Sequence, residues 1–106
     1  MVVFRRLLGE VLRARRMEQG RTLRQVSADA RVSLGYISEI ERGQKEASSE
    51  LLASLCMAMD LPLSDVLREV SDAVAIEERA LALHSVEATP ITAARPGAGD
   101  VVASAA

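Results

Sequence analysis

The sequence predicts an all-α fold, with six helical segments and no β-strand. Apolar residues recur with the 3.6-residue period of a helix along most of residues 1–84. Residues that cap helices precede several of these segments, and Gly or Pro follows several of them. Phe4 and Tyr36 are the only aromatic residues, so Leu, Val, Ile, Met and Ala must build the core. Such a core suits small helices that pack closely.

The first helix begins close to the N-terminus and is strongly amphipathic. Its apolar residues follow the spacing i, i+3, i+4, i+7, i+8: Phe4, Leu7, Leu8, Val11 and Leu12. Gly20 stands where a C-terminal stop belongs. We therefore expect one face of this helix to enter the core.

The second and third helices are short and lie between Thr22 and Lys45. Thr22 and Gln25 have capping-box spacing, and Ser33 is a suitable N-cap for the next helix. Inward faces are predicted for two groups: Leu23, Val26 and Ala30 in the second helix, and Ile37 and Ile40 in the third. Gly43 ends the third helix, and the connection of about three residues fits a helix-turn-helix. By spacing alone, any helical hairpin remains possible.

Three further segments complete the pattern. A fourth helix opens at Ser48 or Ser49 and has a core stripe: Leu52, Leu55, Cys56 and Met59. Pro62 breaks the chain before a fifth helix, and an Ala- and Leu-rich sixth segment follows over residues 73–84. The remaining residues have no helical period and are rich in Pro, Gly and Ala. We predict a domain over 1–72, a C-terminal helix over 73–85 and a flexible tail over 86–106.

The charges are segregated along the chain, although the net charge is only −2. Residues 1–45 hold ten Lys or Arg against five acids, and residues 46–106 hold three Arg against ten acids. The halves thus carry +5 and −7, and the basic half contains the paired short helices. A basic region of this kind is suited to binding phosphate groups. The alternative explanation is that these charges simply lie on solvated helix faces.

The stretch SLGYISEIERG, residues 33–43, resembles the signature of the Cro/C1 repressor (Xre) class of helix-turn-helix regulators. That resemblance extends from Leu12 to about Val70 and implies a five-helix domain whose second and third helices read DNA. Residues 30–52 resemble more narrowly the actinobacterial ClgR regulators of Clp protease genes. The sequence departs from the class at Arg31, where Gly is usual in the turn, and at Ala47, where Pro is common.

The resemblance also implies roles for individual residues. The base-facing positions of the recognition helix are Leu34, Gly35, Ser38 and Glu39. The positions that contact the DNA backbone are Thr22, Arg24, Ser33, Tyr36, Arg42 and Lys45. Arg16 and Glu41 match a structural pair that ties the third helix to the first. Alternatives are a surface role for Glu39 and a core role for Tyr36.

One such unit reads too few base pairs for useful specificity, so we expect a homodimer on an inverted repeat. The C-terminal helix offers the candidate interface: Val70, Val74, Ile76, Ala80 and Leu83. Alternatively, this face folds back on its own core. The end of the tail, Ser104 to Ala106, suggests a handle for the Clp protease, with a featureless tail as the alternative.

The expected function is sequence-specific regulation of transcription at a double-stranded DNA operator, and the resemblance implies activation of Clp protease and chaperone genes. A helical protein-interaction module, or an antitoxin-like partner, is the alternative. One His, a core Cys56 and no paired carboxylates leave no catalytic site, and we expect no cofactor or metal. The charged N-terminus and the lack of a long apolar run predict a cytoplasmic, nucleoid-associated protein without a membrane partner.

Overall fold

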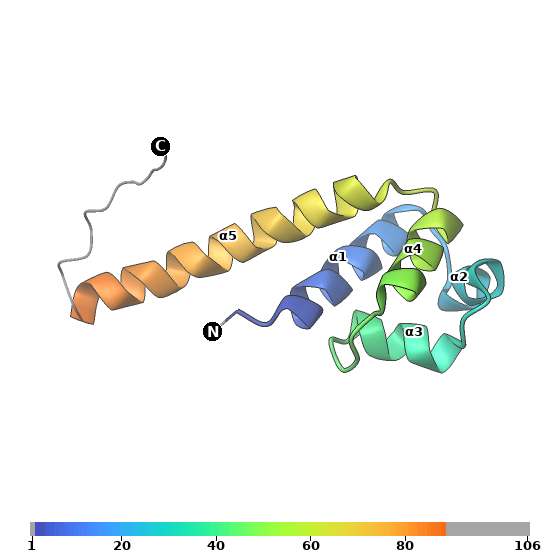
Figure 1. Ribbon diagram of the computed structural model, residues 1–106, viewed down its shortest axis with the longest axis horizontal. Helices are drawn as coiled ribbons and strands as arrows, with labels where there is room; N and C mark the ends of the chain where they lie inside the picture. The colour runs from blue at the N-terminus through green and yellow to red at the C-terminus, as the bar shows by residue number, and fades with distance from the viewer. Residues whose placement is uncertain (1, 89–106) are drawn as a thin grey trace. The chain divides into compact units, whose positions relative to one another are not determined.

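The computed structural model describes residues 2–88, and every regular element in that range is a helix. The helices are α1 (Phe4–Glu18), α2 (Leu23–Ala30), α3 (Leu34–Glu41), α4 (Ser49–Ala58) and α5 (Leu63–Ala88) (Figure 1). The all-α prediction is confirmed. Residues Val2–Ala75 form one compact unit, and the described part of the second unit, residues 76–88, is the C-terminal half of α5.

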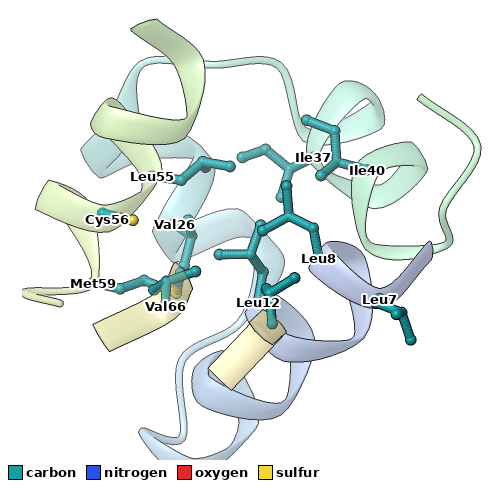
Figure 2. Packing of buried hydrophobic residues seen from close by; sticks show 11 residues of the cluster. Leu7, Leu8, Leu12, Val26, Ile37, Ile40, Leu55, Cys56, Met59 and Val66 are labelled. Carbon is teal, nitrogen blue, oxygen red and sulfur yellow. The ribbon is translucent and has the colours of Figure 1, made fainter. Parts of the chain in front are cut away.

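The core of the unit Val2–Ala75 is made by residues from all five helices and from the end of α4. Its buried apolar residues are Leu7, Leu8, Leu12, Val26, Ile37, Ile40, Leu55, Cys56, Met59, Val66 and Val70. In Figure 2, side chains of α1, α3 and α4 converge on a common centre. Burying one such aliphatic side chain stabilises the fold by about 1.5–3 kcal/mol. Burial also raises the pKa of the Cys56 thiol, in keeping with its packing role.

The helix starts follow the cap residues expected from the sequence. Thr22 Oγ1 accepts a hydrogen bond from the Gln25 backbone N–H, and Gln25 Oε1 accepts one from the Thr22 N–H, at 3.0 and 2.8 Å. Ser33 and Ser48 cap α3 and α4, each with a 3.1 Å bond from a backbone N–H three residues on. The predicted capping box and caps are therefore confirmed.

Four helix ends share one geometry. In each, a left-handed residue follows the helix, and the next N–H bonds the carbonyl five residues back, as in a Schellman motif. At the end of α2, the Val32 N–H donates to the Ser27 carbonyl at 3.2 Å. The four left-handed residues are Gly20, Arg31, Gly43 and Asp60. Arg31 thus has the left-handed conformation, with φ 58° and ψ 45°, although it is not glycine.

The expected boundary between the fifth and sixth helices does not exist, because α5 is continuous from Leu63 to Ala88. No Gly or Pro occurs between these residues, so nothing in the backbone interrupts the helix.

The dimerisation role expected for Val70 is also corrected. Its side chain is only 2% exposed and belongs to the protomer's core, while Val74 packs against that core.

Two further expectations concern the C-terminal end of the chain, where the described residues stop. Residues 86–88, which were expected to belong to a tail, are part of α5. The rest of the tail, including the expected protease handle at 104–106, lies outside the described residues. Within residues 2–88, no helix is long and apolar enough to cross a membrane, and no cluster of His, Cys, Asp or Glu could hold a metal ion.

Candidate nucleic-acid interface

The recognition helix proposed from the sequence is α3, and its inward side is anchored in the core. Ile37, Ile40 and Glu41 are buried, at positions that recur with the helical period. Ser33 caps the helix at its start, and Gly43 ends it in the left-handed conformation. The sequence thus makes a short, well-terminated helix with one face left for other contacts.

Gly9 brings the backbones of α1 and α3 into direct contact. A Cβ atom at this position would lie 2.3 Å from the Ile40 carbonyl oxygen and 2.8 Å from that of Glu41. Gly43 makes a second close approach, because a Cβ there would lie 2.9 Å from Arg6 Cα. Any side chain at Gly9 would push α3 away from α1, so glycine sets their separation.

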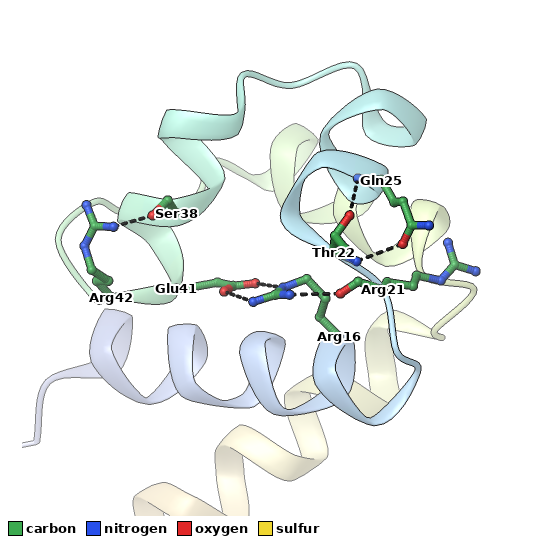
Figure 3. A network of polar contacts seen from close by, with 7 residues as sticks. All are labelled: Arg16, Arg21, Thr22, Gln25, Ser38, Glu41 and Arg42. Atoms are coloured by element: carbon green, nitrogen blue, oxygen red, sulfur yellow. Dashed lines mark hydrogen bonds and ion pairs between the residues drawn. The ribbon is translucent and has the colours of Figure 1, made fainter.

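Arg16 and Glu41 form a fork-to-fork ion pair beside this contact (Figure 3). Arg16 Nε donates to Glu41 Oε2 at 2.7 Å, and Nη2 donates to Oε1 at 2.9 Å. Arg16 Nη1 also donates to the Arg21 carbonyl oxygen at 2.9 Å. The side chains are only 12% and 7% exposed. The hydrogen bonds that Arg16 donates to Glu41 raise the pKa of Arg16, and this effect prevails over burial, which lowers it.

The four predicted base-contacting residues lie on the other sides of α3. Leu34 and Gly35 are exposed, whereas Ser38 and Glu39 are half-buried. Nothing lies within 4 Å of the position that a Cβ on Gly35 would take, so packing does not require glycine there. The Ser38 hydroxyl accepts a hydrogen bond from Arg42 Nη1 (Figure 3).

The predicted backbone-contacting residues with hydroxyl groups are already part of the fold. Thr22 and Ser33 use their side-chain oxygens as N-cap acceptors, which leaves each O–H free to donate. Tyr36 packs its ring against the core, and its hydroxyl donates to the Glu46 carbonyl oxygen at 3.1 Å. The core role considered for Tyr36 therefore accounts for its ring.

The basic side chains divide into two groups. Six of the ten in residues 1–45 make side-chain hydrogen bonds or ion pairs: Arg5, Arg6, Arg15, Arg16, Arg21 and Arg42. Within the part of the chain that the structure describes, the other four have no such partner: Arg13, Arg24, Arg31 and Lys45. Arg24 and Lys45 are thus exposed cations available to an outside anion.

Sequence reasoning assigned no role to Gly9 and none specifically to Arg13. A signal for Gly9 was present, because glycine inside an amphipathic helix is about 1 kcal/mol less favourable than alanine and so indicates a packing reason. No comparable signal existed for Arg13. Its lack of a partner appears only when the other arginines have been placed.

Comparison with known proteins also indicates a helix-turn-helix protein. A helix-turn-helix family model matches residues 12–66. The transcriptional regulator ClgR of Mycobacterium tuberculosis is 61% identical over 75 residues, which cover 71% of this chain and 67% of that protein. The crystal structure of the clp gene regulator ClgR from Corynebacterium glutamicum superposes with a TM-score of 0.71 and 43% identity, over 84% of this chain and 97% of that one.

A more distant likeness concerns the fold alone. The restriction-modification controller protein C.AhdI from Aeromonas hydrophila matches with a TM-score of 0.56 and 24% identity. The match covers 62% of this chain and 94% of that chain.

Proposed function

Because the chain belongs to the helix-turn-helix family and is a DNA-binding transcriptional regulator of the ClgR type, we propose that it binds an inverted-repeat operator as a homodimer and activates Clp protease and chaperone genes. The proposed targets rest on its 61% identity to the ClgR of M. tuberculosis and its likeness to the clp gene regulator of C. glutamicum. Its place of action is then the nucleoid, in the cytoplasm.

The observation that carries the proposal is the division of α3 into a held side and a free side. Gly9 and the Arg16–Glu41 pair hold the inward side, while Leu34 and Gly35 are exposed. In a major groove, Leu34 can contact a thymine methyl and Glu39 can accept from cytosine N4. Ser38 can hydrogen-bond a base edge, and Gly35 lets the helix approach closely.

We also propose contacts to the DNA phosphates, made by positively charged side chains and by hydroxyl groups. Arg24 and Lys45 are exposed and have no partner within residues 2–88. The free O–H groups of Thr22 and Ser33 can donate to phosphate oxygens, and the exposed Arg42 can bind one as well. Tyr36 would have to give up its hydrogen bond to the Glu46 carbonyl oxygen to donate to a phosphate. These contacts set register and orientation and leave sequence discrimination to α3.

The homodimer is proposed through the C-terminal half of α5. Ile76 and Leu83 are 64% and 65% exposed, and Ala80 lies between them at helical spacing. A stripe of exposed apolar side chains favours a protein partner. A second copy of the chain would place two recognition helices on half-sites about 34 Å apart.

The function is tested by selecting duplexes from a random DNA pool with the full chain. We expect an inverted repeat to be enriched. Glu39→Gln should shift the preference at one base pair in each half-site from cytosine towards adenine, because Gln pairs with adenine N6 and N7. Lys45→Ala should weaken all duplexes alike and lower the salt slope by about 0.9 for each protomer.

If no duplex is enriched, the chain is better described as a helical protein-interaction module. Mapping of binding sites across the genome of the source organism then tests the targets. Sites upstream of Clp protease and chaperone genes would support the proposal, and their absence would contradict it.

A further inference from the structure

A surface hollow of about 210 Å³ lies among α1, α2 and α3. The residues that line it are Arg13, Arg16, Leu23, Ser38, Glu41 and Arg42. A water molecule takes about 30 Å³ in the liquid, so the hollow has room for a phosphate group. All six residues belong to the compact unit Val2–Ala75.

The hollow has an excess of positive charge. Both carboxylate oxygens of Glu41 are taken by Arg16, so this acid balances only that arginine. Arg42 donates hydrogen bonds to Ser38 Oγ and Gln44 Oε1, which are both neutral. Arg13 has no partner among the described residues. Two positive charges on the walls are thus uncompensated, and an anion is the complementary ligand.

The position of Arg13 on α1 directs it towards the DNA-reading helix. It follows Gly9 by four residues and precedes Arg16 by three, so the three share one side of α1. Gly9 touches the backbone of Ile40 and Glu41, and Arg16 binds the Glu41 carboxylate. Arg13 therefore lies beside the last turn of α3, and Ser38 lies one turn earlier.

We propose that this hollow binds one phosphate of the DNA backbone, with Arg13 as a phosphate contact that the other α1 arginines cannot replace. The inference rests on the proposed function and adds a third element, α1, to the DNA-binding surface. Arg42 connects the proposed phosphate contact with the proposed base contact of Ser38, because it lines the hollow and donates to the Ser38 hydroxyl (Figure 3). The bound phosphate would then lie beside the base pair that Ser38 reads.

DNA is favoured over a free anion because the hollow adjoins α3, the proposed recognition helix. Arg13 is exposed, so it can reach an extended ligand at the surface. Its planar fork can bind two oxygens of one phosphate, as arginine does in many nucleic-acid complexes. The other arginines of α1 already have partners. Arg15 Nε donates to Glu69 at 2.6 Å, and Arg16, which also lines the hollow, is paired with Glu41.

The test uses the duplex that the wild-type chain enriches from a random pool. Arg13→Gln should lower the slope of log Kobs against log salt by about 0.9 for each bound protomer. Arg13→Lys should keep most of that slope, because it keeps the charge. The control is Arg68→Gln on α5, which removes an exposed arginine paired only with Asp65 and should leave the slope unchanged.

Ethylation interference locates the contact on the duplex. We expect one phosphate in each half-site whose ethylation weakens the wild type and has no effect on Arg13→Gln. The midpoint of thermal unfolding, followed by circular dichroism, should be the same for the wild type and Arg13→Gln, since Arg13 makes no hydrogen bond or ion pair within residues 2–88.

The results separate this inference from the proposed function. If the wild type enriches an inverted repeat but Arg13→Gln keeps its slope and its interference pattern, the inference is overturned and the function stands. If the wild type enriches nothing, both the proposed function and this inference fail.

Inorganic phosphate at constant ionic strength is the second probe. Saturable binding of it that Arg13→Gln abolishes would assign the hollow to a free anion and overturn its assignment to DNA.

Discussion

At the scale of single residues, Gly9 allows the close approach of α1 and α3. We expect Gly9→Ala to destabilise the fold by about 1–3 kcal/mol, because its methyl group would meet the Ile40 carbonyl oxygen. Urea unfolding measures this change. The matched control is Gly35→Ala, where the space is open and helix propensity favours alanine by up to about 1 kcal/mol. Equal effects of the two substitutions would contradict the close contact.

The buried ion pair supports a second residue-scale prediction. Glu41→Ala should destabilise the chain by about 3–5 kcal/mol, because Arg16 would remain buried without its partner. The double variant Arg16→Met, Glu41→Leu should be less destabilised than Glu41→Ala, since it removes both charges. Arg68→Ala, at an exposed pair with Asp65, should change stability by less than about 1 kcal/mol.

The raised pKa of Arg16 does not make this pair sensitive to ordinary pH. A group whose folded pKa lies above its unfolded value stabilises the fold fully below the unfolded pKa. That contribution is lost only as pH rises through the folded pKa. For an arginine, both pKa values lie far above neutral pH, so its share of the stability should be constant across neutral and mildly alkaline pH.

At the scale of helical elements, two of the four left-handed helix ends lack glycine. A left-handed residue with a side chain is disfavoured by about 1–2 kcal/mol, partly offset by the greater freedom of glycine in the unfolded chain. We therefore expect Arg31→Gly and Asp60→Gly each to raise the free energy of unfolding by about 0.5–1 kcal/mol. Gly20→Ala, which reverses the change at a similar end, should lower it.

These elements show where sequence reasoning succeeded and where it could not. Caps at Thr22, Ser33 and Ser48 are local hydrogen bonds, so their residue types and spacing predicted them. Pro62 marked the break after α4, but nothing in the sequence marked Asp60 as left-handed. The expected boundary within α5 was wrong because no Gly or Pro follows Val70 to end the helix there.

At the scale of the whole molecule, the charge partition was visible in the sequence, but the use of each charge was not. Six of the ten basic residues before residue 46 have partners within the protein. Only distances in three dimensions distinguish these from available cations such as Arg13. The Arg16–Glu41 pair was expected only through family resemblance, since 25 residues separate its members.

Assembly gives the prediction that belongs to this scale. The double variant Ile76→Asp, Leu83→Asp should be monomeric in sedimentation velocity, because it places charges on the exposed apolar stripe of α5. Its affinity for an inverted repeat should fall by roughly 100-fold or more, since two half-sites no longer bind as one unit. Glu78→Gln, on another side of the same helix, should remain dimeric. A dimeric double variant would exclude this interface.

The way α3 is held has a consequence for how this regulator can change its DNA target. Its attachment uses the inward isoleucines, Glu41 and the backbone contact with Gly9, and none of these lies among the four proposed base-contacting positions. Leu34, Gly35, Ser38 and Glu39 can therefore be exchanged at little expense in folding. Such a scaffold is well suited to evolving or engineering new operator specificities, one substitution at a time, while the protein stays folded throughout.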